Sequence, residues 1–192
     1  MKLRGLYAIT PEGVDPEKVR LALEGGIALL QYRNKVRDRP HARAVVALGK
    51  RSGVPVIIND DVELALELDA DGVHLGRDDG DLAPARKRLK SRILGASCYN
   101  DAALARKAVR EGADYVAFGS VFASPTKPGA VRAPLSLFGQ PLGVPLCAIG
   151  GITLAHAPQL IAAGADLLAV ISDLFDAPDI RARARDYGTL FR

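Results

Sequence analysis

The segment Gly112-Ala113-Asp114-Tyr115-Val116-Ala117-Phe118 joins a small-residue turn ending in a carboxylate to a short, continuous apolar run. The same turn recurs before another apolar run as Gly164-Ala165-Asp166, and related triplets occur earlier as Gly26-Ile27-Ala28 and Asp69-Ala70-Asp71. The four triplets begin at intervals of 43, 43 and 52 residues. A glycine here can end a helix in the left-handed conformation, and the small residue after it lets helix and strand pack closely. The chain therefore repeats one unit four times.

Eight short apolar runs alternate with segments of helical spacing along the chain. Most runs are continuous rather than alternating, as expected of parallel strands covered on both faces. The predicted strands are Leu6–Thr10, Ala28–Arg33, Val54–Asn59, Gly72–Gly76, Ile93–Cys98, Tyr115–Gly119, Pro145–Ile149 and Leu167–Ser172. The predicted helices include Pro16–Glu24, His41–Arg51, Val62–Leu68, Asp81–Leu89, Asp101–Glu111, Leu154–Ala163 and Ile180–Leu190. Asp15, Asn100 and Thr153 are expected to cap three of these helices.

Strict alternation of strands and helices predicts an α/β protein with a parallel sheet and right-handed crossovers. An open, doubly wound sheet is the rival architecture, but eight evenly spaced units with a four-fold repeat fit a closed barrel better. We therefore expect a single minimal (β/α)8 TIM barrel with eight parallel strands, spanning residues 1–192 as one domain. Such barrels usually run to about 250 residues. This chain of 192 residues leaves about 24 per unit, enough for one strand, one helix and two short loops.

Composition and charge narrow the classes of partner. The chain carries 26 Lys and Arg against 22 Asp and Glu, and its aromatic residues, 5% of the total, do not interleave with basic runs, which disfavours nucleic-acid binding. No apolar stretch reaches the ~18 residues of a membrane span, and we find no signal peptide. Cys98 and Cys147 lie in apolar runs, as reduced core cysteines would. We expect a cytoplasmic protein that binds small molecules rather than nucleic acid or membrane, with a homo-oligomer left open.

Basic side chains end the second predicted strand, at Gln31-Tyr32-Arg33-Asn34-Lys35. Because side chains alternate along a strand, Gln31, Arg33 and Lys35 are expected on one side, in the barrel mouth. Two cations and an amide there suit a diphosphate or another polyanion. A solvated basic loop is the plain alternative, but the mouth of a barrel is where the βα loops carry function, and this position favours the anion site.

Acidic side chains follow the third and fourth strands. Asp60 and Asp61 end strand three, and Asp78, Asp79 and Asp81 follow strand four. Carboxylates on neighbouring strand ends can share Mg²⁺, which proteins hold with one or two carboxylates together with substrate phosphates and water. We interpret Asp61 as the N-cap of the next helix, and the residues alone leave open which of the three later acids would join Asp60. Acids here, facing the cations of strand two, predict a diphosphate–Mg²⁺ site.

The remaining strands also end in groups that suit anions. Ser97 ends strand five, and the longest step in the chain, after strand six, carries Ser124-Pro125-Thr126-Lys127 with two hydroxyls and a cation. Gly150-Gly151 after strand seven would let backbone N–H groups approach a phosphate, aided by a helix N-terminus, and strand eight ends in Ile171-Ser172. Phosphate sites built from loops seven and eight recur across barrel enzymes. The pattern predicts a phosphorylated ligand.

The three histidines are not expected to take part in chemistry. His74 lies inside a predicted strand, where a lone histidine is more often a packed polar residue than a base. His41 and His156 lie in helical segments without evident partners, so both are expected at the surface.

Seven segments together resemble one known family over nearly the whole chain. They are Gly5-Leu6-Tyr7-Ala8-Ile9-Thr10-Pro11, Gln31-Tyr32-Arg33-Asn34-Lys35, Ile58-Asn59-Asp60-Asp61, Asp71-Gly72-Val73-His74-Leu75-Gly76, Gly112-Ala113-Asp114-Tyr115-Val116, Thr126-Lys127 and Ile149-Gly150-Gly151-Ile152. In order and spacing they resemble the thiamine-phosphate synthases. The resemblance implies Mg²⁺-dependent joining of 4-amino-2-methyl-5-hydroxymethylpyrimidine diphosphate to a thiazole phosphate, with release of pyrophosphate. It also implies that the pyrimidine diphosphate ionises to a cation, which the thiazole nitrogen captures.

The resemblance assigns roles to individual positions. It matches Asp60 and Asp79 to the metal ligands, and so selects Asp79 among the three later acids. It matches Gln31, Tyr32, Arg33, Asn34, Lys35, Asn59, Ser97 and Lys127 to the pyrimidine diphosphate site, and Ser124, Pro125, Thr126, Gly151, Ile171 and Ser172 to the thiazole phosphate pocket. Catalytic roles are expected for Arg33, Lys35, Ser97 and Lys127. The three cations among them would stabilise the leaving diphosphate more in the transition state than in the ground state. Two departures are Arg77, where many relatives have Gln, and Ser124, where many have Thr.

Two other functions compete with this one. The related thiazole tautomerases, similar in fold and in the strand-seven glycines, imply proton transfer by a histidine without metal, but this chain has Ser120 where that resemblance needs His. A non-catalytic phosphate-ligand-binding protein on the same scaffold is the second, since one barrel hosts many functions. Retention of Asp60 and Asp79 with Gln31, Arg33 and Lys127 argues against it.

Overall fold

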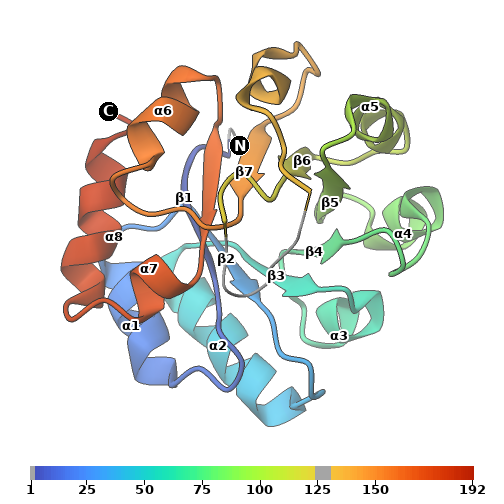
Figure 1. The fold of residues 1–192 in the computed structure, drawn as a ribbon. Helices are drawn as coiled ribbons and strands as arrows, with labels where there is room; N and C mark the ends of the chain where they lie inside the picture. Colours follow the sequence, from blue (N-terminus) through green and yellow to red (C-terminus); the bar gives the residue numbers. More distant parts are fainter. Residues whose placement is uncertain (1–2, 124–130) are drawn as a thin grey trace.

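Eight parallel strands close into a barrel in the computed structural model of this chain, which describes residues 3–123 and 131–192 (Figure 1). Each strand pairs with the next along the chain, and the last pairs with the first. The strands are β1 (Gly5–Ile9), β2 (Leu29–Tyr32), β3 (Val56–Asn59), β4 (Gly72–Leu75), β5 (Ile93–Tyr99), β6 (Tyr115–Phe118), β7 (Leu146–Ile149) and β8 (Leu167–Val170). The predicted (β/α)8 barrel is thus confirmed.

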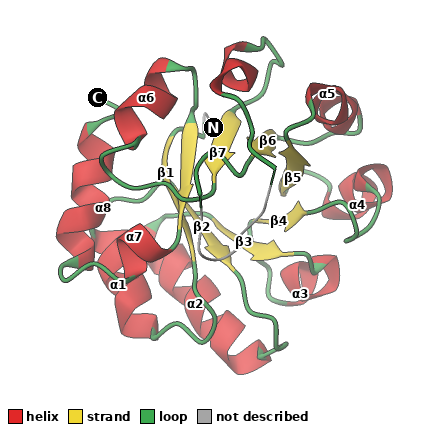
Figure 2. Ribbon diagram, viewed as in Figure 1, coloured by secondary structure: helices red, strands yellow, loops and turns green. Residues whose placement is uncertain are grey.

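A ring of helices surrounds the strands (Figure 2). They are α1 (Pro16–Glu24), α2 (Arg39–Ser52), α3 (Val62–Glu67), α4 (Leu82–Leu89), α5 (Ala102–Arg110), α6 (Ala157–Ala162), α7 (Ser172–Phe175) and α8 (Ile180–Thr189). Between β6 and β7 the described residues form a 3-10 helix, η1 (Leu135–Gly139). Within residues 3–123 and 131–192, none of the helices has the length and apolar character to cross a membrane.

Side-chain caps begin several helices, and two of the three predicted caps are wrong. Asp15 caps α1 as expected, and Asp61 caps α3. The cap of α5 is Asp101 rather than Asn100, because the Asp101 carboxylate accepts hydrogen bonds from two backbone N–H groups of the first turn. Thr153 does not cap α6, because that helix begins only at Ala157.

The repeated triplets fasten the strands to one another at their amino ends. Three carboxylates accept a hydrogen bond from a backbone N–H of the preceding strand: Asp71 from Val56 (2.8 Å), Asp114 from Leu94 (2.7 Å) and Asp166 from Leu146 (3.1 Å). The backbone N–H of the same three aspartates donates to the carbonyl of the same strand residue. Each aspartate thus makes a two-point contact, which fixes the register of β3, β5 and β7.

The first residue of each triplet turns the chain from helix to strand. Gly26, Gly112 and Gly164 have φ of 90°, 98° and 108°, a region that favours glycine, and so the predicted glycine turns are confirmed. Asp69 occupies the same place with φ of 51°. Its carboxylate pairs with Lys50 at 2.7 Å and Arg92 at 2.8 Å. These ion pairs stabilise Asp69 and offset part of the backbone strain of a non-glycine residue at positive φ.

The buried side chains form two clusters, one inside the barrel and one between the strands and the helices. The inner cluster contains Leu3, Tyr7, Ile9, Leu29, Ile57, Tyr115, Ala117, Cys147, Leu167 and Ala169. Both cysteines are free and buried, as the sequence predicts. The inner cluster is unusual in holding two tyrosines, whose hydroxyl groups need partners when buried.

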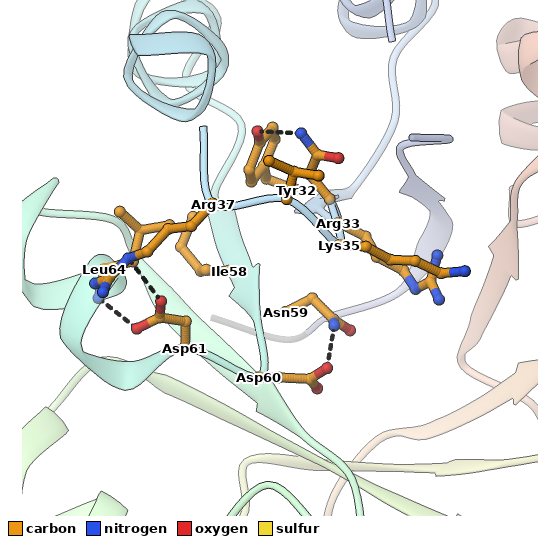
Figure 3. Close-up of a pocket in the computed structure, with 11 residues that line it drawn as sticks. Tyr32, Arg33, Lys35, Arg37, Ile58, Asn59, Asp60, Asp61 and Leu64 are labelled. Carbon is orange, nitrogen blue, oxygen red and sulfur yellow. Dashed lines mark hydrogen bonds and ion pairs between the residues drawn. The ribbon is translucent and has the colours of Figure 1, made fainter. Parts of the chain in front are cut away.

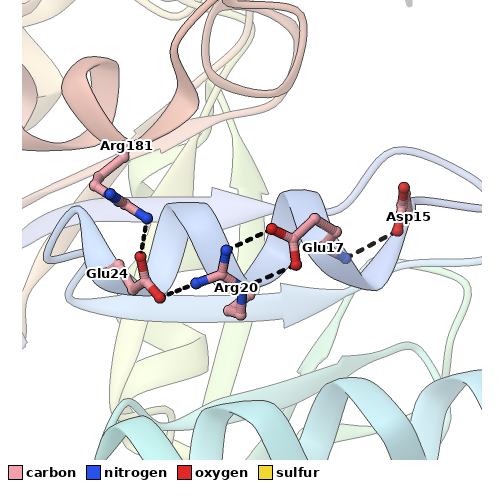
Figure 4. A network of polar contacts seen from close by, with 5 residues as sticks. All are labelled: Asp15, Glu17, Arg20, Glu24 and Arg181. Carbon is pink, nitrogen blue, oxygen red and sulfur yellow. Dashed lines mark hydrogen bonds and ion pairs between the residues drawn. The ribbon is translucent and has the colours of Figure 1, made fainter.

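Ion pairs link the first and last helices where the ring of helices closes (Figure 4). Arg20 of α1 contacts both Glu17 and Glu24 on its own helix, and Glu24 also pairs with Arg181 of α8. Exposed pairs of this kind each contribute at most about 1 kcal/mol. The main contribution to closure is the pairing of β1 with β8.

Glycine 95 makes room for one of the inner tyrosines. A methyl group placed on Gly95 of β5 would overlap the Tyr115 ring on β6, which is fully buried. The backbone at Gly95 does not have a positive φ, so space alone excludes a larger residue.

We predict that Gly95→Ala lowers the free energy of unfolding by about 1–3 kcal/mol, because the added methyl group overpacks the barrel interior. Gly188→Ala is the matched control, since Gly188 lies in α8 with no neighbouring atom within 4 Å of an added methyl group. It is expected to raise stability by about 0.5–1 kcal/mol through helix propensity. Denaturant unfolding measures both, and a neutral Gly95→Ala would contradict the packing argument.

Candidate active site

A buried threonine holds the loop that follows β2. Thr10, at the end of β1, is fully buried, and its hydroxyl accepts from the Arg33 N–H (2.9 Å) and donates to the Arg33 carbonyl (3.2 Å). Both backbone groups of Arg33 are therefore fixed just where the strand ends. Thr10 was missed as a site residue, although its place at a strand end in the predicted mouth is visible in the sequence.

A cavity of about 250 Å³ lies between the loops after β2 and β3 (Figure 3). Arg33 and Lys35 lie side by side at one end of it, away from Arg37, which pairs with Asp61 at 3.1 Å. The lining residues are Tyr32, Arg33, Asn34, Lys35, Val36, Arg37, Ile58, Asn59, Asp60, Asp61 and Leu64. The predicted cations and acids of these two strand ends therefore line one cavity.

Two carboxylates from different loops approach each other beside this cavity. Asp60 follows β3 with φ of 62°, and its N–H donates to the His74 carbonyl at 2.9 Å. Asp79 turns back toward β4, where one carboxylate oxygen accepts from the Gly76 N–H at 2.8 Å. Partial burial, together with repulsion by the Asp79 carboxylate, raises the pKa of Asp60 from 3.8 to about 6. Without a cation the pair is unfavourable, and a divalent ion would relieve the repulsion.

The donor set fits Mg²⁺. Hard carboxylate oxygens from one or two aspartates, completed by phosphate oxygens and water, are how proteins usually bind this ion. Asn59 donates from its amide to the Asp60 carboxylate and so helps to orient it. Asp61 instead caps α3, as the sequence predicts. Asp81 occupies the N-cap position of α4, and of Asp78, Asp79 and Asp81 it is Asp79 that acts on Asp60.

Gln31 and Ser97 do not line this cavity and instead contact polar side chains of the barrel interior. Gln31 is 2% exposed, and its amide nitrogen donates to the Tyr7 hydroxyl. The Ser97 hydroxyl contacts Nε2 of His74 at 2.9 Å, and Nδ1 of the same ring contacts the Tyr115 hydroxyl at 2.7 Å. Burial lowers the pKa of His74 from 6.5 to about 4, so the ring is neutral near pH 7. His74 is a packed polar residue, as predicted, but it directly contacts a predicted site residue.

The loops after β7 and β8 form the other side of the mouth. Gly151 has φ of 63°, and a side chain there would overlap the carbonyl of Ala123, so only glycine fits. The helix N-terminus expected next to Gly151 is not there, because α6 begins at Ala157. A different short helix, α7, begins at Ser172 directly after Ile171. The predicted site residues Ser124, Pro125, Thr126 and Lys127 lie outside the described residues.

Arg77, His41 and His156 make contacts that the sequence does not predict. The Arg77 guanidinium lies over the Tyr99 ring, 4.6 Å from its centre, and its backbone N–H donates to the Tyr99 hydroxyl at 3.3 Å. His41 and His156 do have partners, against expectation. His41 contacts the Val14 carbonyl at 2.8 Å, and the His156 ring packs 4.3 Å from that of Phe122.

Comparison with known proteins gives one consistent result. A family model described as thiamine monophosphate synthase matches residues 6–174. A thiamine-phosphate synthase of Aromatoleum aromaticum is 58% identical, over 99% of this chain and 97% of that protein. A second thiamine-phosphate synthase, of Methylobacillus flagellatus, is 53% identical over 98% of this chain and 96% of that protein. The solved structure of a thiamine phosphate pyrophosphorylase from Pyrococcus furiosus superposes with a TM-score of 0.87. It is 31% identical in sequence, and the match covers 99% of this chain and 96% of that one.

We predict that Asp60→Asn and Asp79→Asn each raise the melting temperature of the metal-free protein near pH 7 by about 1–3 °C. Because the pKa of Asp60 is raised in the folded protein, protonation of Asp60 stabilises the fold. This contribution is fully present below about pH 4 and is lost as the pH rises through about 6. Above pH 6 the ionised pair therefore destabilises the fold, and either Asn relieves it. Thermal melts at pH 7 and pH 5 test this, since the gain must shrink at pH 5.

Asp61→Ala is the control for this prediction, because it removes the α3 cap and the pairing with Arg37. It is expected to lower the melting temperature at both pH values. A gain for Asp60→Asn that is equally large at pH 5 would show that carboxylate repulsion is not its cause.

Proposed function

The chain belongs to the thiamine monophosphate synthase family and makes thiamine phosphate, and we propose that it does so with Mg²⁺ held by Asp60 and Asp79. In the proposed reaction, the bond between the pyrimidine methylene carbon and the diphosphate oxygen breaks. The thiazole nitrogen then forms the new bond to that carbon, and pyrophosphate leaves with the electron pair of the broken bond. The pyrimidine passes through a cation, as the family resemblance implies.

The observation that carries the proposal for the metal is the approach of two carboxylates from neighbouring loops, beside a cavity lined by basic side chains. Partial burial and the nearby Asp79 carboxylate together raise the pKa of Asp60. Arg33 and Lys35 line the same cavity from the loop after β2, and the charge of Arg33 acts to lower the pKa of Asp60. Opposite charges arranged in this way suit a diphosphate bridging a divalent ion on one side and basic side chains on the other.

When bound, Mg²⁺ would neutralise part of the charge that gathers on the leaving diphosphate. Arg33 is fixed through its backbone by Thr10, so its guanidinium starts from a defined place at the mouth. Its five donors suit two phosphate oxygens at once. Lys35 and Lys127 would add positive charge, and Asn59 and Ser97 would donate hydrogen bonds. Because negative charge on the diphosphate grows as the bond breaks, these groups would stabilise the transition state more than the ground state.

We assign the thiazole phosphate to the loops after β6, β7 and β8. Gly151 has a positive φ and no room for a side chain, which would let its backbone approach a phosphate closely, and α7 begins at Ser172, just after β8. Short extra helices of this kind are part of phosphate sites in many barrels. Ile171 would contact the thiazole ring, and Ser124, Pro125 and Thr126 would complete the pocket from the loop after β6.

The two rival functions gain no support. The hydroxyl of Ser120, which stands where a tautomerase would need His, donates to the Phe122 carbonyl at 2.6 Å and so is engaged within its own loop. The relatives at 53% identity and above are named as synthases, and a purely binding protein would not require the paired carboxylates. We further propose that residues 1–192 form one domain, which acts in the cytoplasm on small-molecule substrates. Its oligomeric state, for which the sequence leaves a homo-oligomer open, can be measured by size-exclusion chromatography with light scattering.

Pyrophosphate release with both substrates tests the function directly. We expect release only when the pyrimidine diphosphate, the thiazole phosphate and Mg²⁺ are all present, and release must stop when EDTA is added. Release that does not depend on the thiazole phosphate would show that the pyrimidine is not being transferred to the thiazole, and no release at all would remove the synthase reaction. Release that persists in EDTA would remove the metal from the mechanism.

We predict that Asp60→Ala lowers kcat by about 100-fold or more while the Kd for thiazole phosphate changes by less than about 2-fold. The reason is that Asp60 would act on the leaving diphosphate and not on the thiazole. Asp78→Ala is the matched control, one residue from Asp79 and exposed, and should keep wild-type kcat. Steady-state kinetics and calorimetry measure the two effects, and equal losses in both would sink the assignment of Asp60 to the metal.

A further inference from the structure

A chain of hydrogen bonds crosses the barrel interior. It runs from Gln31 on β2 through Tyr7 on β1 and Tyr115 on β6 to His74 on β4 and Ser97 on β5. After the Gln31 amide nitrogen, the successive contacts are Tyr7 Oη to Tyr115 Oη (2.8 Å), Tyr115 Oη to His74 Nδ1 (2.7 Å) and His74 Nε2 to Ser97 Oγ (2.9 Å). All members but Ser97 are at least nine-tenths buried. The family roles considered above involve only its two ends.

The direction of these bonds follows from the chemistry of the groups. The Gln31 amide nitrogen can only donate, so the Tyr7 oxygen accepts and must place its single proton elsewhere. Among the described residues its other partner is Tyr115, so Tyr7 donates to Tyr115. Tyr115 then donates its own proton to Nδ1 of His74.

The imidazole of His74 carries the direction onward. Because Nδ1 accepts from Tyr115, it carries no proton, so the ring proton is on Nε2, and Nε2 donates to the Ser97 oxygen. The proton of the Ser97 hydroxyl is then not used within the chain of bonds. In the opposite direction Ser97 would donate to His74 and would present only lone pairs, which repel the oxygens of a phosphate.

We propose that Tyr7, Tyr115 and His74 are positioning residues that make Ser97 a hydrogen-bond donor toward the pyrimidine diphosphate. This inference rests on the proposed function, in which Ser97 contacts that substrate. The ligand is rich in acceptor oxygens, so a donor is the useful state of the hydroxyl. The stacking of His74 on Tyr115, with ring centres 5.5 Å apart, and the space left by Gly95 hold the ring that connects the two halves.

Tyr115→Phe tests the central link, because it keeps the ring and removes the oxygen. We expect kcat/KM for the pyrimidine diphosphate to fall about tenfold, the value of one well-placed hydrogen bond, while KM for the thiazole phosphate changes less than about 2-fold. Ser97→Ala should cause a loss at least as large. The double variant should be no worse than Ser97→Ala alone, since both changes remove the same bond to substrate.

The outcomes separate this inference from the proposed function. If Ser97→Ala has no effect, the proposed contact of Ser97 with substrate fails, and the positioning role fails with it. If Ser97→Ala reduces activity while Tyr115→Phe does not, or if the two losses multiply in the double variant, the positioning role alone is overturned. The Mg²⁺-dependent release of pyrophosphate is measured independently of both.

Two variants of His74 guard against a loss of folding being mistaken for a loss of positioning. His74→Gln keeps a side-chain N–H that can donate to Ser97 and should restore most of the activity that His74→Leu loses. Equal losses in the two would overturn the positioning role.

Nitrogen-15 NMR of the wild-type protein gives a readout that needs no substrate. The signals of the three histidines can be separated with His74→Gln, and His74 should show a protonated Nε2 and an unprotonated Nδ1 near neutral pH. A proton on Nδ1 would reverse the direction of the bonds and overturn the inference.

Discussion

The two-point contacts of Asp71, Asp114 and Asp166 set the strand register on which the rest of the structure depends. Each aspartate accepts from and donates to one residue of the preceding strand at the amino end of the barrel. Because a slip of one residue would turn every side chain of a strand to the other face, this register decides which residues enter the interior. In β5 it places Ser97 on the side of His74 and Tyr115, and the ladder from β2 to β3 brings the strand ends that carry Arg33 and Asp60 to one mouth.

The mouth holds groups that disfavour the folded state, and the interior compensates for them. Asp60 combines a positive φ with a like-charged neighbour, so it lowers stability in the absence of a cation. Thr10 and His74 anchor the backbone on either side of it, through Arg33 and through the Asp60 N–H. Buried residues that take no direct part in the reaction thus hold the strained backbone of the site in place.

The sequence predicts the barrel, its eight strands and acids at the ends of β3 and β4, because these depend on local periodicity and on strand order. The choice of Asp79 as the partner of Asp60 comes from the family resemblance alone. The sequence misses features that depend on pairing across the sheet. Tyr7 and Tyr115 are 108 residues apart, and nothing local to either indicates that their hydroxyls meet. The predicted caps of α5 and α6 are also wrong. At α5 the Asp101 carboxylate, rather than the neighbouring Asn100, accepts from the first turn, and α6 begins at Ala157, too far along the chain for Thr153 to cap it.

A barrel of this size has no inserted domain among its described residues to shape the site, so its interior must serve two purposes. Phenylalanine at positions 7 and 115 would fill nearly the same volume as tyrosine and would avoid burying two hydroxyls. The structure instead holds both hydroxyls in one chain of hydrogen bonds that ends at the mouth. Burying polar groups is costly unless each finds a partner, and here every member of the chain supplies a partner to the next. The same side chains therefore fill the core and connect it to the candidate active site.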